Sequence, residues 1–334
     1  MAGWNRRSFL RTSTGLGVAS VAGSGATLSP LMAAQDKEAR RECGRVKSID
    51  THIHVVNIRL PGIPKKAAPD GTSFDGPVRK RADSIRKEME SAGIEQALCM
   101  PRWDNADDDP LGINETLELA VEVPGLHAIG IADPTKTHQG HLDRVEDLLK
   151  KGKVKAFKAY LGYLHHGPGS PSYGPYYELA ARYRLPFIFH TGDTFSHLAK
   201  VKFAHPLLVD EVAVDHPEVR FVIAHLGNPW LTDAAEVLYK NNKKERANVW
   251  TDLSGFVVGS AADFQAYRAK GELKAIAEDI RKAFDYAERP HRFLYASDWP
   301  LAPMLTYNDF MREVIPEEHH QAIFRENAKE LFKL

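Results

Sequence analysis

From residue 46 onward, short apolar runs alternate with longer amphipathic stretches, and this alternation constrains the fold more than any other feature of the chain. Eight of the apolar runs have the length and composition of buried strands. Strands that alternate with helices form parallel sheets, and eight strands close a (β/α)8 barrel. The sequence therefore predicts an α/β fold, with a single TIM-barrel domain over residues 35–334. The predicted strands cover residues 46–56, 95–101, 126–132, 154–161, 186–191, 220–226, 248–253 and 292–297.

The stretches between these runs have helical periodicity. In residues 141–150, for example, Leu142, Val145, Leu148 and Leu149 lie on one stripe and charged residues occupy the other positions. A doubly wound open sheet is the alternative architecture, but no Gly-x-Gly-x-x-Gly turn follows the first strand to support it. The predicted helices cover residues 78–92, 113–121, 141–150, 176–183, 206–215, 232–240 and 272–287.

Residues 1–34 have the pattern of a twin-arginine signal peptide. Arg6-Arg7 precede a weakly apolar stretch rich in Gly and Ala, and the small residues Ala33-Ala34 follow as a cleavage site. The stretch is too short and too rich in Gly and Ser for a membrane span. A disordered basic tail is the alternative. We expect cleavage and export to the periplasm, without stable membrane insertion.

The charge balance bears on the partners of the chain. The 44 basic and 44 acidic residues give a formal net charge of zero, and no basic block is present. This composition argues against nucleic acid and anionic membranes as partners. A small-molecule substrate is the expected partner, and assembly into a homo-oligomer stays open.

The first predicted strand carries two histidines that can share a metal ion. Side chains two apart on a strand point the same way, so His52 and His54 are expected to face one space. His190, His225 and Asp298 end three later runs, and the carboxyl ends of barrel strands meet at one rim. Imidazoles with a carboxylate suit zinc, and also manganese or iron. We predict His52, His54, His190 and Asp298 as ligands of one divalent ion.

Such an ion would activate a water molecule. It lowers the pKa of bound water from about 15.7 toward 7 and so supplies hydroxide at neutral pH. His225 is then expected to act as general acid or base beside this water. Asp298 would accept the proton of the water as it attacks.

Four segments in order along the chain resemble the amidohydrolase superfamily. They are most similar to its amidohydrolase-related branch, which holds lactonases and other hydrolases alongside metal-dependent non-oxidative decarboxylases and hydratases. The resemblance covers residues 46–332, implies the four ligands named above and places His225 in the catalytic position. The matching segments are Asp50-Thr51-His52-Ile53-His54, His190-Thr191-Gly192, Ala224-His225-Leu226-Gly227 and Ser297-Asp298-Trp299-Pro300.

Two cationic residues leave alternatives open. Lys158 ends the fourth strand with the parity that points Val154, Ala156 and Lys158 into the barrel. In binuclear members of the superfamily a lysine on this strand is carboxylated and bridges two metals; otherwise Lys158 would bind a substrate carboxylate or carbonyl. We expect zinc, with manganese as the alternative, and one ion rather than two. Arg102, just past the second strand, is the candidate for a substrate carboxylate.

The expected function is a metal-dependent hydrolase that cleaves an ester, lactone or amide bond with metal-bound hydroxide. Residues 248–255 look closer to lactonase-like relatives than to decarboxylases. The alternative is a metal-dependent decarboxylase of an aromatic or unsaturated acid, with Arg102 gripping the carboxylate and His225 donating a proton. A non-enzymatic metal-binding barrel is a third class. Asp50 is expected to brace the histidine pair, and Asp252 to position a substrate or anchor its loop.

Overall fold

The computed structural model describes residues 46–63, 74, 76–243 and 247–334. These residues belong to one compact unit that runs from Val46 to Leu334. The predicted signal peptide, residues 1–34, lies outside the described residues. Cleavage and export therefore stay predictions.

Every strand pairing between neighbours is parallel, as predicted. β3 and β4 are two halves of one strand interrupted at Ile129, so the strands occupy the eight predicted positions in the predicted order. The strands are β1 (Ser48–Ile53), β2 (Ile94–Cys99), β3 (Leu126–Ala128), β4 (Gly130–Ile131), β5 (Phe157–Ala159), β6 (Pro186–Phe189), β7 (Arg220–Ile223), β8 (Val249–Asp252) and β9 (Phe293–Leu294).

The strands form two hydrogen-bonded sheets, β1-β2-β3 and β4 through β9, and backbone hydrogen bonds join the sheets at both junctions. At the first junction the Ile129 amide donates to the Cys99 carbonyl at 3.0 Å. At the second junction the Thr51 amide donates to the Tyr295 carbonyl at 3.1 Å, and the Asp298 amide donates to the His52 carbonyl at 2.8 Å. The barrel is therefore closed, and its seam runs between the first and last strands.

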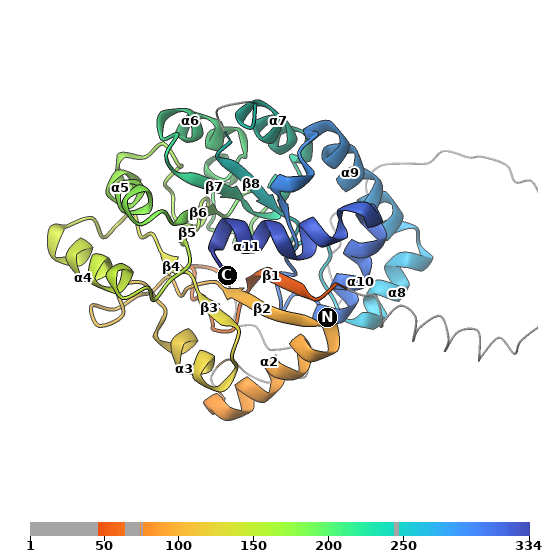
Figure 1. The fold of residues 1–334 in the computed structure, drawn as a ribbon, viewed down its shortest axis with the longest axis horizontal. Helices are drawn as coiled ribbons and strands as arrows, with labels where there is room; N and C mark the ends of the chain where they lie inside the picture. The colour runs from red at the N-terminus through yellow and green to blue at the C-terminus, as the bar shows by residue number, and fades with distance from the viewer. Residues whose placement is uncertain (1–45, 64–73, 75, 244–246) are drawn as a thin grey trace, which may run out of the picture. The chain divides into compact units, whose positions relative to one another are not determined.

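Helices surround this barrel (Figure 1). All seven predicted helices are confirmed, and α8, α10 and α11 are additional. No helix among the described residues is long and apolar enough to cross a membrane. The helices are α2 (Val78–Ala92), α3 (Asn114–Glu122), α4 (Gln139–Lys150), α5 (Gly174–Tyr183), α6 (Leu207–Asp215), α7 (Leu231–Asn241), α8 (Ala261–Ala269), α9 (Glu272–Ala287), α10 (Met304–Val314) and α11 (Asn327–Phe332).

The apolar core has an outer and an inner part. The outer part packs the strands against the surrounding helices. The inner part fills the barrel with side chains such as Leu98, Val222 and Trp250, and it includes Leu331 and Phe332 of α11. Arg220, at the start of β7, donates to the Leu331 carbonyl, so α11 covers the amino-terminal end of the barrel. The opposite end is left for a site.

The fourth barrel strand follows the predicted parity over its ordered part. Ala156 lies in the inner cluster, and Lys158 lines the cavity at the carboxyl end of the barrel. The prediction for Val154 is wrong, because this residue packs in the outer cluster. β5 begins only at Phe157, so the strand alternation does not extend back to Val154.

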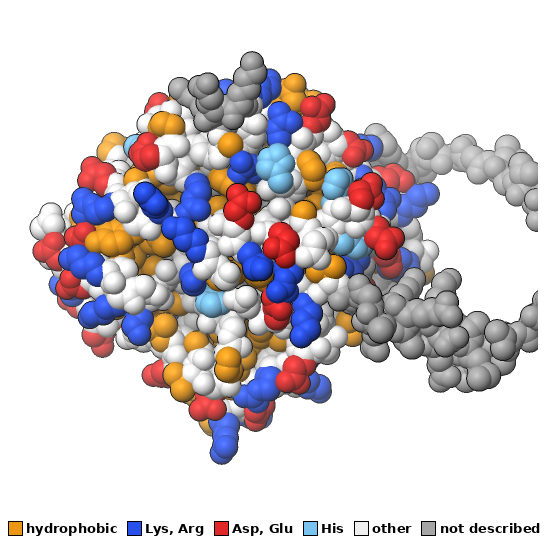
Figure 2. Space-filling view, in the orientation of Figure 1, with side chains coloured by type: hydrophobic (Ala, Val, Ile, Leu, Met, Phe, Trp, Pro, Cys, Tyr) orange, Lys and Arg blue, Asp and Glu red, His pale blue; other side chains and the backbone are white. Residues whose placement is uncertain are grey.

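The surface seen in the same orientation agrees with the balanced composition. Figure 2 shows Lys and Arg side chains interspersed with Asp and Glu side chains over this face. No extended region of a single charge is visible on it.

Candidate metal centre

The carboxyl ends of the strands bring six of the predicted site residues to one cavity. Its free space is about 670 Å³, including the part open to solvent. β1 and the residue after it supply two of the six, and β5, β6, β7 and β9 each carry or precede one of the others. The six residues are His52, His54, Lys158, His190, His225 and Asp298.

Arg102 is the predicted residue that the structure does not bring to this cavity. Its guanidinium donates to Glu115 at 2.7 Å and to Asp104 at 3.1 Å. The carboxylates of Glu115 and Asp104 therefore hold the Arg102 side chain away from the cavity. This pairing argues against direct contact between Arg102 and a substrate.

Two of the site residues, His225 and Asp298, have unusual backbone conformations. His225, Leu226 and Gly227 have positive φ angles of 61°, 44° and 62°, and Asp298 has a φ of 57°. Residues other than glycine rarely adopt this region, and such strain collects at functional sites. The sharp turn after β7 directs His225 into the barrel, and hydrophobic periodicity does not reveal it.

Two groups of potential metal ligands share His52: one adds His54 and Asp298, and the other adds His225 and Asp252. In each group the ligand atoms all lie within 4.8 Å of one another. Asp298 Oδ1 lies 3.1 Å from His54 Nε2 and 3.8 Å from His52 Nε2. Burial alone would raise the pKa of Asp298, but His54 and His52 lower that pKa well below its usual value. The carboxyl group is therefore ionised and faces two imidazole nitrogens.

Asp252 orients one of these imidazoles from behind. Its Oδ2 lies 3.0 Å from His52 Nδ1. Burial alone would raise the pKa of Asp252. The charge of His52 and its hydrogen bond to the carboxylate instead lower this pKa below the usual range. An ionised carboxylate only accepts, so His52 Nδ1 donates and Nε2 keeps its lone pair for a metal. Asp252 Oδ1 also accepts from the His225 amide at 2.8 Å and the Ser254 amide at 3.1 Å, so Asp252 anchors its loop, one of the two predicted roles, and it does not line the cavity.

His190, predicted as the fourth ligand, stands beside His225 and belongs to neither of the two groups. His190 Nδ1 lies 3.1 Å from His225 Nε2, and its own Nε2 lies 3.0 Å from the Asp193 carbonyl. The carbonyl can only accept, so His190 Nε2 donates and Nδ1 faces the cavity as a lone pair. Burial lowers the pKa of His225 to about 4, so this imidazole is uncharged at neutral pH.

Asp50 braces the strand that carries the histidine pair, as expected. Its Oδ1 accepts hydrogen bonds from the His52 amide at 3.1 Å and the Ser297 amide at 3.0 Å. The carboxyl group thus ties β1 to the segment that carries Asp298. It does not reach the cavity lining.

The residues present fit a divalent cation. Asp298 Oδ1 is buried and accepts no hydrogen bond from the described residues, yet two imidazole nitrogens lie within 3.8 Å of it. Buried carboxylates are usually paired with a positive charge or coordinate a metal ion. Imidazole and carboxylate ligands suit zinc or manganese. His52, His54 and Asp298 would hold the ion, with His190 and His225 on the adjacent wall.

Comparison with protein families decides the classification. A family model described as amidohydrolase matches residues 49–334. The chain belongs to the amidohydrolase family. This assignment confirms the resemblance inferred from the four sequence segments, and a comparison with curated proteins finds no match.

Solved structures of similar fold support the barrel. An uncharacterised TIM-barrel protein from Bordetella bronchiseptica is 18% identical, with a TM-score of 0.61 over 86% of this chain and 99% of that one. An amidohydrolase from Burkholderia multivorans is 16% identical, with a TM-score of 0.61 over 86% and 100%. A manganese-bound 5-carboxyvanillate decarboxylase from Novosphingobium aromaticivorans is 13% identical, with a TM-score of 0.56 over 88% and 99%. At these identities the likeness establishes the fold.

Proposed function

We propose that this amidohydrolase family member is a metal-dependent hydrolase that cleaves an ester, lactone or amide bond of a small organic substrate. The observation that carries the proposal is the geometry of the cavity: the potential metal ligands His52, His54 and Asp298 line it together with the imidazole of His225. The lowered pKa values of Asp298 and His225 favour the base form of both groups. When bound, a divalent cation polarises a carbonyl group and makes water more acidic.

His225 and Asp298 have different roles in this proposal. His225 Nε2 accepts a proton from the attacking water and returns it to the leaving oxygen or nitrogen. Asp298 would help to hold the cation and would serve as the second acceptor for protons of the water. His54 and His52 keep Asp298 ionised, as the lowered pKa indicates.

The cavity walls suggest the shape of the substrate. Ile58, Leu60, Tyr163 and Phe195 line the cavity beyond the histidines. Lys158 Nζ is fully buried and makes no hydrogen bond with the described residues, and burial lowers its pKa to about 8. An apolar body with a carbonyl or carboxylate oxygen directed at Lys158 would match both features.

Decarboxylation of an aromatic or unsaturated acid is the second candidate, favoured by the same unpartnered lysine. Lys158 could hold a carboxylate without help from Arg102, and the similar 5-carboxyvanillate decarboxylase carries manganese. The reaction also needs a donor that protonates the carbon from which CO₂ departs. The base forms of Asp298 and His225 make this candidate weaker than hydrolysis.

Isotope labelling separates the two reactions. Zinc- or manganese-loaded protein is offered a panel of γ- and δ-lactones, aryl esters, anilides and hydroxylated benzoates. Hydrolysis in H₂¹⁸O places one ¹⁸O in the product carboxylate, whereas decarboxylation in D₂O releases CO₂ and places deuterium on carbon. A His225→Gln variant should bind metal but lose activity by about 10²-fold or more. Carbon dioxide release without any ester, lactone or amide cleavage would replace the hydrolase proposal.

Zinc is the proposed metal, with manganese as the alternative, and one ion is favoured over two. A second ion would need a carboxylated Lys158 as its bridge. Metal analysis by plasma mass spectrometry, together with intact mass under mild conditions, tests both points. Two ions per chain with an added 44 Da on Lys158, roughly the mass of CO₂, would contradict the single-ion proposal.

Export remains part of the proposal. Residues 1–34 would direct the folded protein to the periplasm through their twin-arginine pattern. Replacing Arg6 and Arg7 together by Lys should retain the uncleaved chain in the cytoplasm. Periplasmic accumulation of that variant would contradict the proposed signal.

A further inference from the structure

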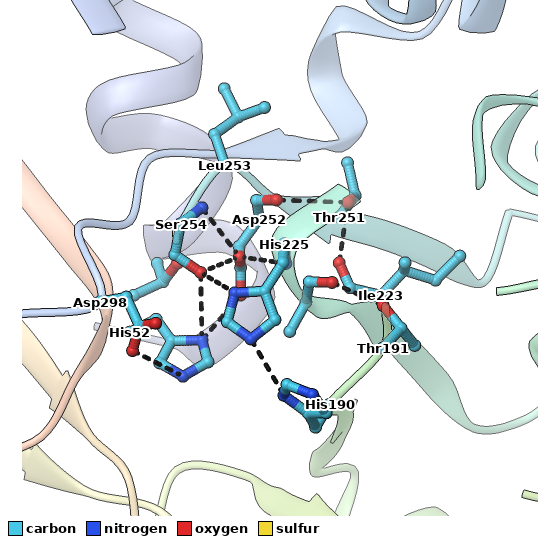
Figure 3. Close-up of polar contacts among 12 residues, drawn as sticks. His52, His190, Thr191, Ile223, His225, Thr251, Asp252, Leu253, Ser254 and Asp298 are labelled. Carbon is cyan, nitrogen blue, oxygen red and sulfur yellow. Dashed lines mark hydrogen bonds and ion pairs between the residues drawn. The ribbon is translucent and has the colours of Figure 1, made fainter. Parts of the chain in front are cut away.

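The hydroxyl of Ser254 contacts both His225, the proposed base, and Asp252, the carboxylate behind His52. The hydroxyl oxygen is 2.8 Å from His225 Nδ1 and contacts Asp252 Oδ1 (Figure 3). The same hydroxyl is 3.4 Å from His52 Nδ1. Ser254 therefore connects the imidazole proposed as base with the carboxylate that orients a metal ligand.

The number of protons available to each group determines which atom donates in these hydrogen bonds. Asp252 Oδ1 already accepts from the His225 amide at 2.8 Å and the Ser254 amide at 3.1 Å, which marks it as an ionised acceptor. A serine hydroxyl has one proton, and its close contact with the carboxylate requires that proton. The Ser254 oxygen can then only accept from His225. His225 Nδ1 must be the protonated nitrogen.

The other side of the His225 ring favours the opposite arrangement. His190 Nδ1 is a lone pair that faces His225 Nε2 at 3.1 Å. A proton on Nε2 would make a hydrogen bond there, and it would remove the lone pair that a base needs. The ring is thus placed between two competing acceptors. Hydrogen bonding to an ionised carboxylate through Ser254 is the stronger of the two.

We propose that Ser254 is a positioning residue that fixes His225 in the Nδ1–H tautomer, so that Nε2 presents its lone pair to the metal site. Asp252 then orients both imidazoles: it contacts His52 directly through Oδ2 and reaches His225 through the Ser254 hydroxyl. The tautomer stands on the contacts alone. Its effect on turnover rests on the proposed function.

The tautomer can be measured in the metal-free protein without any substrate. Nitrogen-15 NMR of histidine-labelled protein distinguishes Nδ1–H from Nε2–H, and the His225 signals are assigned by their loss in His225→Gln. Wild type should show Nδ1–H. Ser254→Ala should shift His225 to Nε2–H, since only the His190 contact remains, and Ser254→Thr should restore Nδ1–H.

Thr251→Val is the matched control. The Thr251 hydroxyl also lies on this strand segment, but it donates to the Ile223 carbonyl at 2.7 Å and touches neither imidazole. This variant should keep the wild-type tautomer. Wild-type His225 protonated at Nε2, or Ser254→Ala unchanged at Nδ1, would overturn the proposal. Should Ser254→Ala not fold, the wild-type and Ser254→Thr spectra still decide it.

Turnover supplies a separate readout once a substrate is found. Ser254→Ala should lower kcat by about 10–100-fold with zinc content unchanged, because a base in the wrong tautomer lacks its lone pair. Ser254→Thr should recover most of this loss. A failure to find hydrolysis would leave the NMR result standing and would count only against the proposed function.

Discussion

At the scale of single residues, the site depends on groups that never touch the cavity. Asp252 does not line the cavity, yet its two oxygens contact His52 Nδ1 and the His225 amide at 3.0 Å and 2.8 Å. Hydrogen bonds of this kind fix the tautomer and orientation of metal ligands. The affinity for metal should therefore depend on Asp252 although it does not bind the ion.

Asp252→Asn tests this dependence. The amide keeps the shape of the side chain, but its NH₂ group must face either His52 Nδ1 or the His225 amide, and neither can accept without a change of tautomer or geometry. Zinc affinity should fall by about 10–100-fold, measured by competition with a chromophoric chelator. Asp263→Asn removes the same charge from the exposed cap of α8 and should leave the affinity unchanged.

Gly255 permits close approach behind the site. Its φ is +72°, and a Cβ there would lie 3.0 Å from His225 Nδ1 and 3.2 Å from Asp298 Oδ2. Gly255→Ala should cost roughly 1–2 kcal/mol for the left-handed backbone and should also displace both side chains. We expect a lower melting temperature together with weaker metal binding.

Gly152→Ala separates the two effects of that substitution. Gly152 has a similar φ of +64°, but a Cβ there meets nothing within 4 Å. This control should lose a comparable amount of stability and keep its metal affinity. Equal metal affinity in the two variants would show that the crowding at Gly255 has no functional consequence.

The sequence predicts those residues of the candidate site whose metal-binding side chains stand at the ends of apolar runs. His52, His54, His190, His225 and Asp298 each follow or end an apolar run, and barrel geometry brings such ends together. Arg102 satisfies the same rule but lies elsewhere, because local carboxylates compete for it. The role of Ser254 depends on distances to atoms from other strands, which spacing along one strand cannot supply.

At the scale of elements, side chains of α10 hydrogen-bond to residues at the start of β1, the strand that leads to the histidine pair. Asn308 Nδ2 donates to Ser48 Oγ at 3.0 Å, and Arg312 donates to the Val46 carbonyl at 2.7 Å. Asn308 is fully buried. These contacts join the last long helix to the first strand across more than 250 residues of chain. The position of β1 thus depends on the end of the sequence.

Asn308→Ala should loosen this connection. The substitution removes the 2.7 Å acceptor of Arg312 Nε and one of the two donors to Ser48 Oγ, and the loss of a buried hydrogen-bond partner costs about 1–3 kcal/mol. Denaturant unfolding should show this loss, whereas Gln139→Ala on the exposed face of α4 should stay within about 0.5 kcal/mol of wild type. An Asn308→Ala protein as stable as the Gln139 variant would rule out a role for α10 in holding β1.

The elements themselves were predictable to different degrees. The eight strand positions and seven helices are confirmed because the apolar periodicity that defines them is local. α8 buries only Phe264, so no apolar stripe marks it, and α11 has only six residues. α10 buries Met304, Tyr307, Met311 and Val314 at helical spacing, so its sequence pattern could have predicted it. The interruption at Ile129 and the turn after β7 arise from tertiary packing, so the sequence pattern contains no sign of them.

At the scale of the whole molecule, the candidate metal centre lies across the seam that closes the barrel. His52 lies on β1, His54 directly follows β1, and Asp298 follows β9. Backbone hydrogen bonds link these segments, including one of 2.7 Å from the His54 amide to the Trp299 carbonyl. A cation held by the three side chains would reinforce the same connection. Metal binding should therefore stabilise the closed barrel as well as serve catalysis.

Removal of the metal should lower the melting temperature. At a metal concentration one hundred times the Kd, binding contributes about 2.7 kcal/mol to the folded state. For a domain of this size, that corresponds to a shift of about 4–5 °C between zinc-loaded and chelator-treated protein. His54→Ala should abolish the shift, because the variant lacks one ligand. A zinc-dependent shift that survives in His54→Ala would place the ion elsewhere.

Hydrogen exchange locates this stabilisation within the molecule, because the barrel has two sheet junctions and only one carries the proposed ligands. Amides of residues 48–56 and 293–300 lie at the seam between β1 and β9. The Ile129 amide, which donates to the Cys99 carbonyl, lies at the other junction. Zinc should slow exchange at the seam by more than at Ile129, since local opening of the seam must release the ion. Equal protection at both junctions would mean that the metal stabilises the fold as a whole, and the seam would then have no special dependence on the ion.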